Sequence, residues 1–175
     1  DFLQQGPAPF YAGFGSMIPR DPEQLAEIVV TAARQTNQRL ILSPGWGRVL
    51  PKGSLPESVL VLEHCPHQWL FPRLQGAIHH GGAGTTATTL ISGIPSIVVA
   101  FFADQPAWGH TLEQLGVSPA TYAATTVTTE ALSESLQILS TASSFKQRAL
   151  QLQKLIQQEK GLSQTAEAIE HVLDR

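Results

Sequence analysis

The segment best suited to bind a charged ligand is a glycine-rich turn that opens with two histidines. It reads His79-His80-Gly81-Gly82-Ala83-Gly84-Thr85-Thr86 and lies between a predicted strand, Ala77–His79, and a predicted helix, Thr85–Ile91. Backbone N–H groups at a helix N-terminus attract anions, and glycines let the main chain approach a phosphate closely. The turn therefore predicts a diphosphate site, in which one histidine donates to the ligand and the hydroxyls of Thr85 and Thr86 cap the helix.

The same glycines also have a purely geometric interpretation. A tight strand-to-helix turn needs glycine for its backbone conformation alone, and the sequence fits this interpretation equally well. The spacing Gly-x-Gly-x-x-Gly of dinucleotide-binding proteins and the Gly-Lys-Ser/Thr of P-loops are both missing, which weakens those two nucleotide classes.

Two further turns follow predicted strands. In Phe14-Gly15-Ser16-Met17, the Ser16 hydroxyl has the chemistry to donate to a phosphate, although a loop cap is the favoured interpretation of this turn in isolation. In Asp104-Gln105, a carboxylate beside an amide offers acceptors and donors for sugar hydroxyls. A helix cap at Asp104, before Pro106, accounts for that turn equally well.

Aromatic and histidine-containing loops are candidates for a nucleobase site. Trp46 forms either a wall of the site or part of the core, whereas for Trp108 the core is favoured. The segment Cys65-Pro66-His67-Gln68 follows the third predicted strand, where main-chain atoms can pair with the edge of a base. No His-x-x-x-His motif, cysteine pair or Asp-x-Asp motif is found, so we expect neither a bound metal nor a resident cofactor.

Short apolar runs bounded by glycine and proline alternate with helical patterns and position these turns. This order predicts an α/β domain, with a Rossmann-like parallel sheet of about six strands and helices on both faces. Ligands of such sheets bind at the carboxyl ends of the strands, where all three turns lie. Asp21 and Pro22 predict a helix start, and 129–175 is predicted to be a helical tail interrupted near Gly161. The expected strands are Phe10–Phe14, Leu40–Leu42, Val59–Leu62 (covered on both faces), Ala77–His79, Ile97–Val99 and Ala120–Tyr122.

Composition limits the class of protein. A chain of 175 residues with 42% hydrophobic content supports one domain, residues 1–175, in which 1–8 is expected to be the remnant of an interdomain linker. A net charge of −3 gives no basic surface for nucleic acid, and no apolar run is long enough to predict a transmembrane segment. The single cysteine, Cys65, favours a reducing, cytoplasmic location.

Taken together, these motifs resemble the GT-B fold glycosyltransferases of family 1, in the branch of the sterol glucosyltransferases and their bacterial relatives. The blocks that carry the resemblance occur in the family's order from Pro9 to Pro119. They are Gly13-Phe14-Gly15-Ser16-Met17, Cys65-Pro66-His67-Gln68-Trp69-Leu70-Phe71-Pro72, His79-His80-Gly81-Gly82-Ala83-Gly84-Thr85-Thr86, Gly93-Ile94-Pro95 and Phe101-Phe102-Ala103-Asp104-Gln105-Pro106.

The resemblance implies the C-terminal, donor-binding domain of an inverting enzyme that transfers a hexose from a UDP-sugar, with UDP-glucose as the expected donor, to a hydroxyl of a sterol, lipid or other small aglycone. It implies that Ser16, His79, Gly81 and the Gly82–Thr85 amides hold the diphosphate. Asp104 and Gln105 would hold the sugar, and the segment Cys65–Gln68 would hold the uracil beside Trp46. Relatives in plants carry a tryptophan near His64, so stacking on uracil is not transferred from that branch.

The catalytic base of this family lies in an N-terminal acceptor-binding domain that this sequence does not contain. We therefore expect no catalytic residue in the chain, little transfer by the chain alone, and an acceptor-binding domain or subunit as its partner. Two alternatives remain at this stage. One is a UDP-sugar epimerase-like domain, for which further acid and base residues are missing, and the other is a non-catalytic module that binds nucleotide sugars.

Overall fold

The strands form one all-parallel sheet in the computed structural model, which describes residues 1–173. The sheet has six strands, as the sequence predicts, and the structure places them in the order β3-β2-β1-β4-β5-β6. The order reverses direction between β1 and β4, and this switch point is where parallel sheets bind ligands. The bounds are β1 Phe10–Gly13, β2 Leu40–Ser43, β3 Val59–Val61, β4 Gly76–His79, β5 Ser96–Ala100 and β6 Thr121–Ala123.

The register of the two central strands brings their turns together. Gly13 of β1 pairs with His79 of β4, so both strands end at the same level of the sheet. On the other side of β4, His79 pairs with Val98 of β5. The turns that follow β1, β4 and β5 therefore open at one edge, which confirms the arrangement expected of parallel strands.

Alternation along the strands places apolar side chains on both faces of the sheet. Phe10 and Ala12 belong to one buried cluster, and Tyr11 between them belongs to another. The prediction that the third strand is covered on both faces is confirmed in part, because Val59 packs against one cluster and Leu60 against the other. All three residues of β3 are only half-buried, because β3 is an edge strand with a single neighbour, β2.

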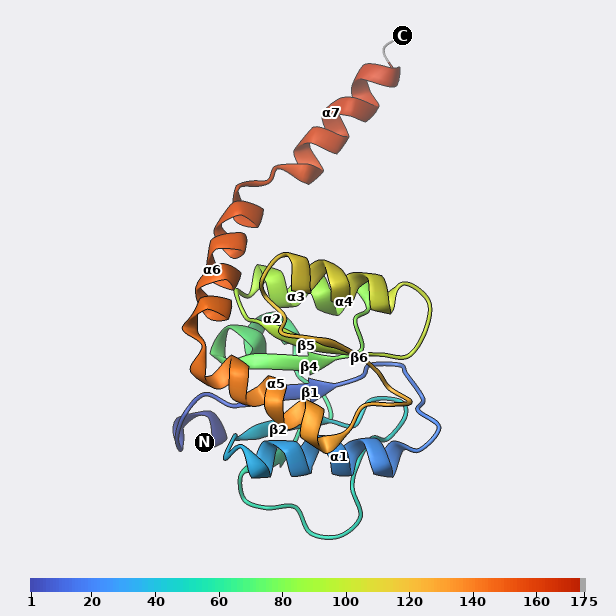
Figure 1. The fold of residues 1–175 in the computed structure, drawn as a ribbon. Coiled ribbons are helices and arrows are strands. Elements are labelled where there is room, and N and C mark those ends of the chain that lie inside the picture. The colour runs from blue at the N-terminus through green and yellow to red at the C-terminus, as the bar shows by residue number, and fades with distance from the viewer. Residues whose placement is uncertain (174–175) are drawn as a thin grey trace.

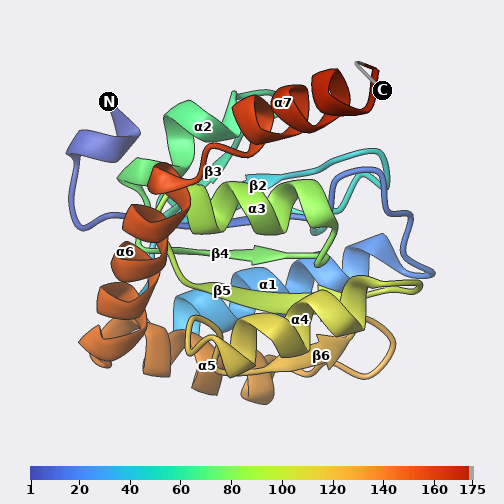
Figure 2. The same cartoon turned by 90° about the horizontal axis from the view of Figure 1, so that it is seen from above.

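Helices cover both faces of the sheet (Figures 1 and 2). Helix α1, Pro22–Gln35, packs beside α5, Thr129–Thr141, on one face. The other face carries α2 (His67–Leu70), a 3-10 turn (Phe71–Arg73), α3 (Ala83–Ile91) and α4 (Gln105–Gln114). The predicted start of α1 is confirmed, since Asp21 accepts a hydrogen bond of 2.9 Å from the Gln24 N–H and Pro22 occupies the first turn.

The C-terminal part of the described chain is helical, with one break that the sequence did not predict. Ala142 adopts an extended conformation and separates α5 from α6, Ser143–Gln158. Alanine favours helices, so no residue type marked this break. Helix α6 packs on α3, and α7, Gly161–Leu173, projects beyond the sheet (Figure 1). Residues 174–175 of the predicted tail lie outside the described residues.

The segment 1–8, predicted to be a linker, packs against the start of β2. It contains a short 3-10 helix, Phe2–Gln4. The guanidinium of Arg39 lies 4.1 Å from the centroid of the Phe2 ring and donates a hydrogen bond of 2.9 Å to the Pro7 carbonyl. None of the helices within residues 1–173 is long and apolar enough to cross a membrane.

Candidate functional site

The glycine-rich turn after β4 begins its helix earlier than predicted. Helix α3 starts at Ala83, with Gly82 as N-cap, and no side chain caps it. The expected capping by Thr85 and Thr86 is therefore wrong, because both lie inside the first turn of the helix. Thr86 is buried and its hydroxyl has no partner, while its N–H bonds to the Gly82 carbonyl at 2.9 Å. A helix leaves its first four N–H groups without intrahelical partners, which here are those of residues 82–85.

Gly81 holds the turn in a shape that no other residue fits. Its φ of +82° lies in the left-handed region, which favours glycine. A Cβ added there would lie 2.8 Å from both the Gln105 carbonyl oxygen and Val98 Cγ1. The turn is thus packed directly against the β5 strand and the start of α4.

His79 is fully buried and is fixed in one tautomer by this turn. Its Nδ1 accepts a hydrogen bond of 3.1 Å from the Gly81 N–H. Burial, with smaller contributions from His80 and His67, lowers the pKa of His79 from 6.5 to about 3, so the ring is neutral near pH 7. The single ring proton therefore resides on Nε2, and this buried N–H has no hydrogen-bond partner.

His80 fills the gap between the turns after β1 and β4. A Cβ added at Gly82 would lie 2.3 Å from His80 Nε2, and one added at Gly15 would lie 3.2 Å from its Cε1. Its Nδ1 is buried without a partner. Burial lowers the pKa of His80, and the negative charge of Asp104 opposes that shift. The sequence interpretation assigned the ligand contact to His79 alone, although the adjacent histidines and the two glycines were already visible as a pattern.

The turn after β1 carries both Ser16 and the support for Trp46. Ser16 is exposed in this turn. The Trp46 N–H donates a hydrogen bond of 2.9 Å to the Gly15 carbonyl, so the β2–β3 loop lies on the β1 turn. The Trp46 side chain is 80% exposed, which rules out a place in the core.

The turn after β5 gives its two polar residues different roles. Asp104 is exposed and occupies the N-cap position of α4, but its carboxylate accepts a hydrogen bond of 2.8 Å from the Trp108 indole N–H and makes no capping bond to the helix backbone. The predicted core position of Trp108 is wrong, because the side chain is 37% exposed and bound to that carboxylate at the surface.

Gln105, by contrast, is buried and bonded within the protein. Its Oε1 accepts the N–H groups of Phe101 and Phe102 at 2.7 and 3.3 Å, and its Nε2 donates to Met17 Sδ at 3.2 Å. Gln105 therefore ties the turn after β5 to the turn after β1. A contact between this amide and a sugar, which the sequence predicts, requires some of these bonds to be exchanged.

The segment predicted to lie near a nucleobase follows β3. Pro66 and Gln68 are exposed, and Cys65 is a half-buried free thiol. The His67 ring stacks on Phe71, with 4.5 Å between ring centroids, and its Nε2 lies 3.1 Å from the Tyr11 hydroxyl. The imidazole of His67 is thus engaged in packing, which leaves the main-chain atoms of this segment and the exposed Gln68 amide available to a base.

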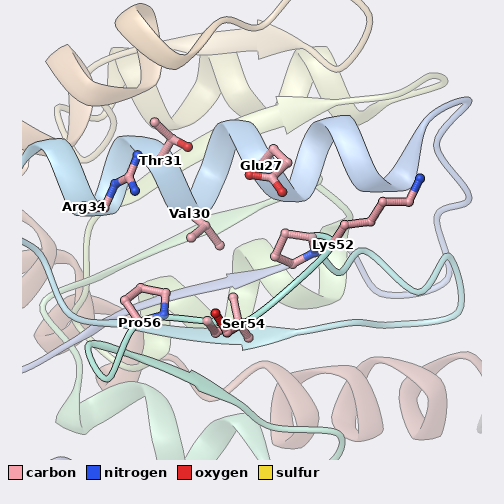
Figure 3. A pocket seen from close by; sticks show the side chains of 9 residues that line it. Glu27, Val30, Thr31, Arg34, Lys52, Ser54 and Pro56 are labelled. Carbon is pink, nitrogen blue, oxygen red and sulfur yellow. The ribbon is translucent and has the colours of Figure 1, made fainter.

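Two pockets open on the surface. A pocket of about 590 Å³ lies among the segments that follow β1, β5 and β6. A smaller one, of about 270 Å³, lies between α1 and residues 51–56, and its lining includes Glu27, Arg34 and Lys52 (Figure 3). Lys52 also forms an ion pair of 2.6 Å with Glu23. Only the larger pocket shares its turns with Ser16 and Asp104.

Metal-binding side chains are not gathered at this edge. Among the residues that the structure describes, no group of three or more His, Cys, Asp or Glu side chains is placed to hold a metal ion. The polar groups that this edge does offer are backbone amides, histidines, hydroxyls and the Asp104 carboxylate.

Several solved glycosyltransferase structures share this fold. The spinosyn forosaminyltransferase SpnP has a TM-score of 0.81 at 22% identity, over 99% of this chain and 46% of that protein. The kitacinnamycin glycotransferase gives 0.78 at 24% identity, over 96% and 46%. Os79 from O. sativa, solved in complex with UDP, gives 0.73 at 15% identity, over 87% and 37%. The chain thus has the fold of one half of a GT-B glycosyltransferase.

A family model identifies the chain more closely. Residues 26–170 match the model described as "Erythromycin biosynthesis protein CIII-like, C-terminal domain", and the chain belongs to this family of GT-B glycosyltransferase domains. It is 38% identical to the sterol 3-beta-glucosyltransferase UGT80B1 of Arabidopsis thaliana over 95% of this chain, and 45% identical to UGT80A2 of the same plant over 68%. It spans 27% and 19% of these two relatives.

Proposed function

We propose that this chain binds a UDP-sugar, with UDP-glucose as the expected donor, as the donor-binding domain of an inverting glycosyltransferase. The observation that carries the proposal is the buried His79 Nε2–H without a partner, beside the N-terminus of α3. A buried N–H group without an acceptor costs about 1–3 kcal/mol, and a phosphate oxygen supplies the missing acceptor. The four free amides of residues 82–85 and the helix dipole favour the same negative charge.

In the proposed reaction an acceptor hydroxyl attacks the anomeric carbon of the sugar. A carbon–oxygen bond to the acceptor forms, the bond from the anomeric carbon to the phosphate oxygen breaks, and UDP leaves with that electron pair. The α3 amides stabilise the negative charge that develops on UDP, and the His79 N–H adds to this once a shift of the turn uncovers its Nε2, which is fully buried in the structure. The acceptor proton passes to a base outside this chain.

The remaining contacts follow from the placement of the exposed residues. Ser16 donates to the phosphate near the glycosidic oxygen, and the Asp104 carboxylate accepts from sugar hydroxyls, with Gln105 holding the turn that carries it. Main-chain atoms of Cys65–Gln68 bind the uracil beside Trp46. The placement of Ser16 and Asp104 rests on the turns after β1, β4 and β5 lying at one edge of the sheet. The placement of the uracil rests on β2 and β3 running parallel to β1 and on the hydrogen bond from the Trp46 N–H to the Gly15 carbonyl.

The acceptor and the partner are inferred from the relatives. Because UGT80B1 and UGT80A2 are named sterol 3-beta-glucosyltransferases, we propose a sterol or similar apolar alcohol as acceptor. The relatives are several times longer than this chain, which supports an N-terminal acceptor-binding domain or subunit that supplies the base and without which transfer is negligible. Adding such a domain should restore transfer of glucose, and its failure to do so would contradict this part.

A cytoplasmic location is proposed as well, on the strength of the single free thiol at Cys65. Cell fractionation with an antibody against the chain tests it, and recovery from a secreted fraction would contradict it.

Calorimetric titration with UDP, UDP-glucose and TDP-glucose tests the donor site. His79→Asn keeps an acceptor near the position of Nδ1 and removes the Nε2 donor, so all three ligands should bind roughly 10–100-fold more weakly. Asp104→Ala should weaken only the two sugar-bearing ligands, by roughly tenfold. His110→Ala, an exposed histidine of α4, is the matched control and should change nothing.

Amide spectra provide the second readout. UDP should shift the amide signals of Gly81 through Thr86. If millimolar UDP leaves these signals in place, or if His79→Asn binds UDP as tightly as the original chain, the donor-site proposal is wrong.

A further inference from the structure

The carboxylate of Asp104 stands at the start of α4 without capping it. The backbone of Asp104 is already helical, with a φ of −81° and a ψ of −8°. An N-cap residue usually has an extended backbone, which turns its side chain back to the first N–H groups of the helix. Asp21 has that geometry at α1, where its carboxylate accepts from the Gln24 N–H. At α4 the N-cap position therefore does not fix the orientation of the carboxylate.

The group that does fix it is Trp108, one helical turn further along α4. The Trp108 backbone N–H donates to the Asp104 carbonyl at 3.1 Å, and the indole N–H donates to Oδ2 of the Asp104 carboxylate at 2.8 Å. Residues at this spacing face each other on a helix, so both bonds form within the same turn. A hydrogen bond to a charged acceptor is stronger than one between neutral groups, so the indole holds the carboxylate in one orientation.

Trp108 itself is a firm support for this bond. Its side chain is 37% exposed, so most of its surface is covered by the protein. A tryptophan ring has few rotatable bonds, and holding it in place costs little conformational entropy. The helix that carries it packs on β5 and β6 (Figure 2). At Gly109, directly after Trp108, this packing is so close that an added Cβ would lie 2.3 Å from Thr121 Oγ1.

The second oxygen of the carboxylate, Oδ1, is left for a ligand. Asp104 is exposed, and within residues 1–173 the hydrogen bond from the protein to its carboxylate goes to Oδ2. Its negative charge also acts on the turn after β4, where it opposes the lowering of the His80 pKa by burial. The carboxylate thus lies within electrostatic reach of the turn proposed to hold the diphosphate. An oxygen fixed beside that turn suits the hydroxyls of a sugar attached to the diphosphate.

We propose that Trp108 is a positioning residue for the donor sugar, because its indole N–H holds Oδ2 of Asp104 and so directs Oδ1 to the sugar hydroxyls. The inference rests on the proposed function, since Asp104 meets a sugar only if the chain binds a UDP-sugar. Trp108 acts through Asp104 and does not touch the ligand. Its contribution is preorganisation, because a carboxylate that is already oriented does not have to be ordered when the sugar binds.

Two substitutions separate the indole N–H from the aromatic ring. Trp108→Phe keeps a ring and removes the donor, whereas Trp108→Gln removes the ring and keeps a donor that reaches a carboxylate one turn away. In calorimetric titrations of the whole chain, Trp108→Phe should weaken UDP-glucose binding roughly three- to tenfold and leave UDP binding unchanged. Trp108→Gln should recover most of the loss. The unchanged UDP affinity also shows that each variant is folded.

The matched control is Trp69→Phe, the same substitution at another surface tryptophan. Trp69 is 52% exposed, and its ring lies 4.3 Å from the Arg73 guanidinium. This variant should leave the ratio of UDP-glucose affinity to UDP affinity unchanged. A double-mutant cycle gives the second readout. In the Asp104→Ala background, Trp108→Phe should have no further effect on UDP-glucose binding, because the carboxylate through which Trp108 acts is already missing.

The inference is overturned if Trp108→Phe binds UDP-glucose as tightly as the original chain. It is overturned equally if Trp108→Gln loses more affinity than Trp108→Phe, which would assign the contribution to the ring, or if the loss persists in Asp104→Ala. An equal loss for UDP and UDP-glucose would show a general effect on the structure of the site and contradict positioning of the sugar.

Failure of this inference differs from failure of the proposed function. If UDP shifts Gly81 through Thr86 and UDP-glucose binds, but Trp108→Phe changes nothing, the role of Trp108 is wrong and the donor site stands. If UDP leaves those signals in place, the proposed function is wrong, and the role of Trp108 is wrong with it.

Discussion

The turns after β4 and β5 meet the same backbone requirement with different residues. Each needs one residue in the left-handed region, which is Gly81 with a φ of +82° after β4 and Ala103 with a φ of +58° after β5. Gly81 is buried against the Gln105 carbonyl, where no Cβ fits. Ala103 is exposed, so its Cβ is accommodated and only the conformation is unfavourable.

The two turns also differ in how far the protein itself fixes their side chains. The turn after β4 is closed, with His79 buried and its Nδ1 bonded to the Gly81 N–H. In the turn after β5, Phe102 and Asp104 are exposed to solvent instead. The buried Gln105 amide oxygen accepts hydrogen bonds from the backbone N–H groups at the start of this turn. We infer that the diphosphate part of the proposed site is organised by this chain alone, whereas the sugar and acceptor part is completed by its ligands and by the remainder of the enzyme.

Gly81→Ala should break the turn after β4 and gives the largest expected effect. A left-handed alanine and the overlap with the Gln105 carbonyl together should lower the free energy of unfolding by about 2–5 kcal/mol. Urea unfolding followed by circular dichroism measures this change. Gly84→Ala is the matched control, because no atom lies within 4 Å of a Cβ there and the amide is retained. A Gly81→Ala variant as stable as Gly84→Ala would show that the turn is not packed as described.

Acid should destabilise the fold through His79. The unfolded chain titrates this residue near pH 6.5 and the folded chain near 3, so between these values the unfolded state binds more protons. Stability is therefore full above pH 6.5 and falls as the pH drops below it, by about 1.4 kcal/mol per pH unit for one proton.

Burial also lowers the pKa values of His67 and His80, so their contributions have the same sign. Urea unfolding at pH 7.5, 5.5 and 4.5 should show a decrease of about 2–3 kcal/mol that is smaller in His79→Asn. An identical pH dependence in the two proteins would mean that His79 titrates normally in the folded state.

Gln105→Leu should open the turn after β5 without touching the turn after β4 directly. Loss of the Oε1 acceptor leaves the N–H groups of Phe101 and Phe102 without their partner, which should cost about 1–3 kcal/mol. Gln105→Glu keeps an oxygen acceptor for these N–H groups but buries a carboxylate and loses the donor to Met17 Sδ, so it should recover only part of the stability. We also expect UDP-glucose affinity to fall in Gln105→Leu while UDP affinity is retained, and an equal loss for both ligands would contradict the division between the turns.

Much of the fold was predictable because each strand and its turn carried a local pattern. Runs such as Ile97–Val99 and the cap formed by Asp21 and Pro22 depend on residues within a few positions, and both were predicted close to their bounds. The edge position of β3 and the break at Ala142 were not predictable in this way, because they depend on neighbours distant in sequence.

The candidate site shows the same limit. The sequence places Ser16, His79 and Asp104 in turns that the sheet brings to one edge. It does not reveal that the Gln105 side chain is turned inward to Phe101 and Met17, that Trp108 bonds to Asp104, or that His80 lies between two glycines. The contacts of Gln105 with Met17 and of His80 with Gly15 join distant segments that only tertiary packing brings together. The bond between Trp108 and Asp104 spans a single helical turn, and the sequence interpretation missed it because it placed Trp108 in the core.

Ala103→Gly changes the backbone of the turn after β5 and gives the smallest expected change in stability. Glycine removes the cost of the left-handed alanine but adds freedom to the unfolded chain, so the free energy of unfolding should rise by no more than about 1 kcal/mol. The looser turn should nevertheless hold Asp104 and Phe102 less firmly, and UDP-glucose should lose affinity relative to UDP. Asn37→Gly, at a φ of +53° after α1, is the control for adding a glycine elsewhere. If both variants leave the UDP-glucose to UDP ratio unchanged, the strained alanine has no part in positioning the sugar contact.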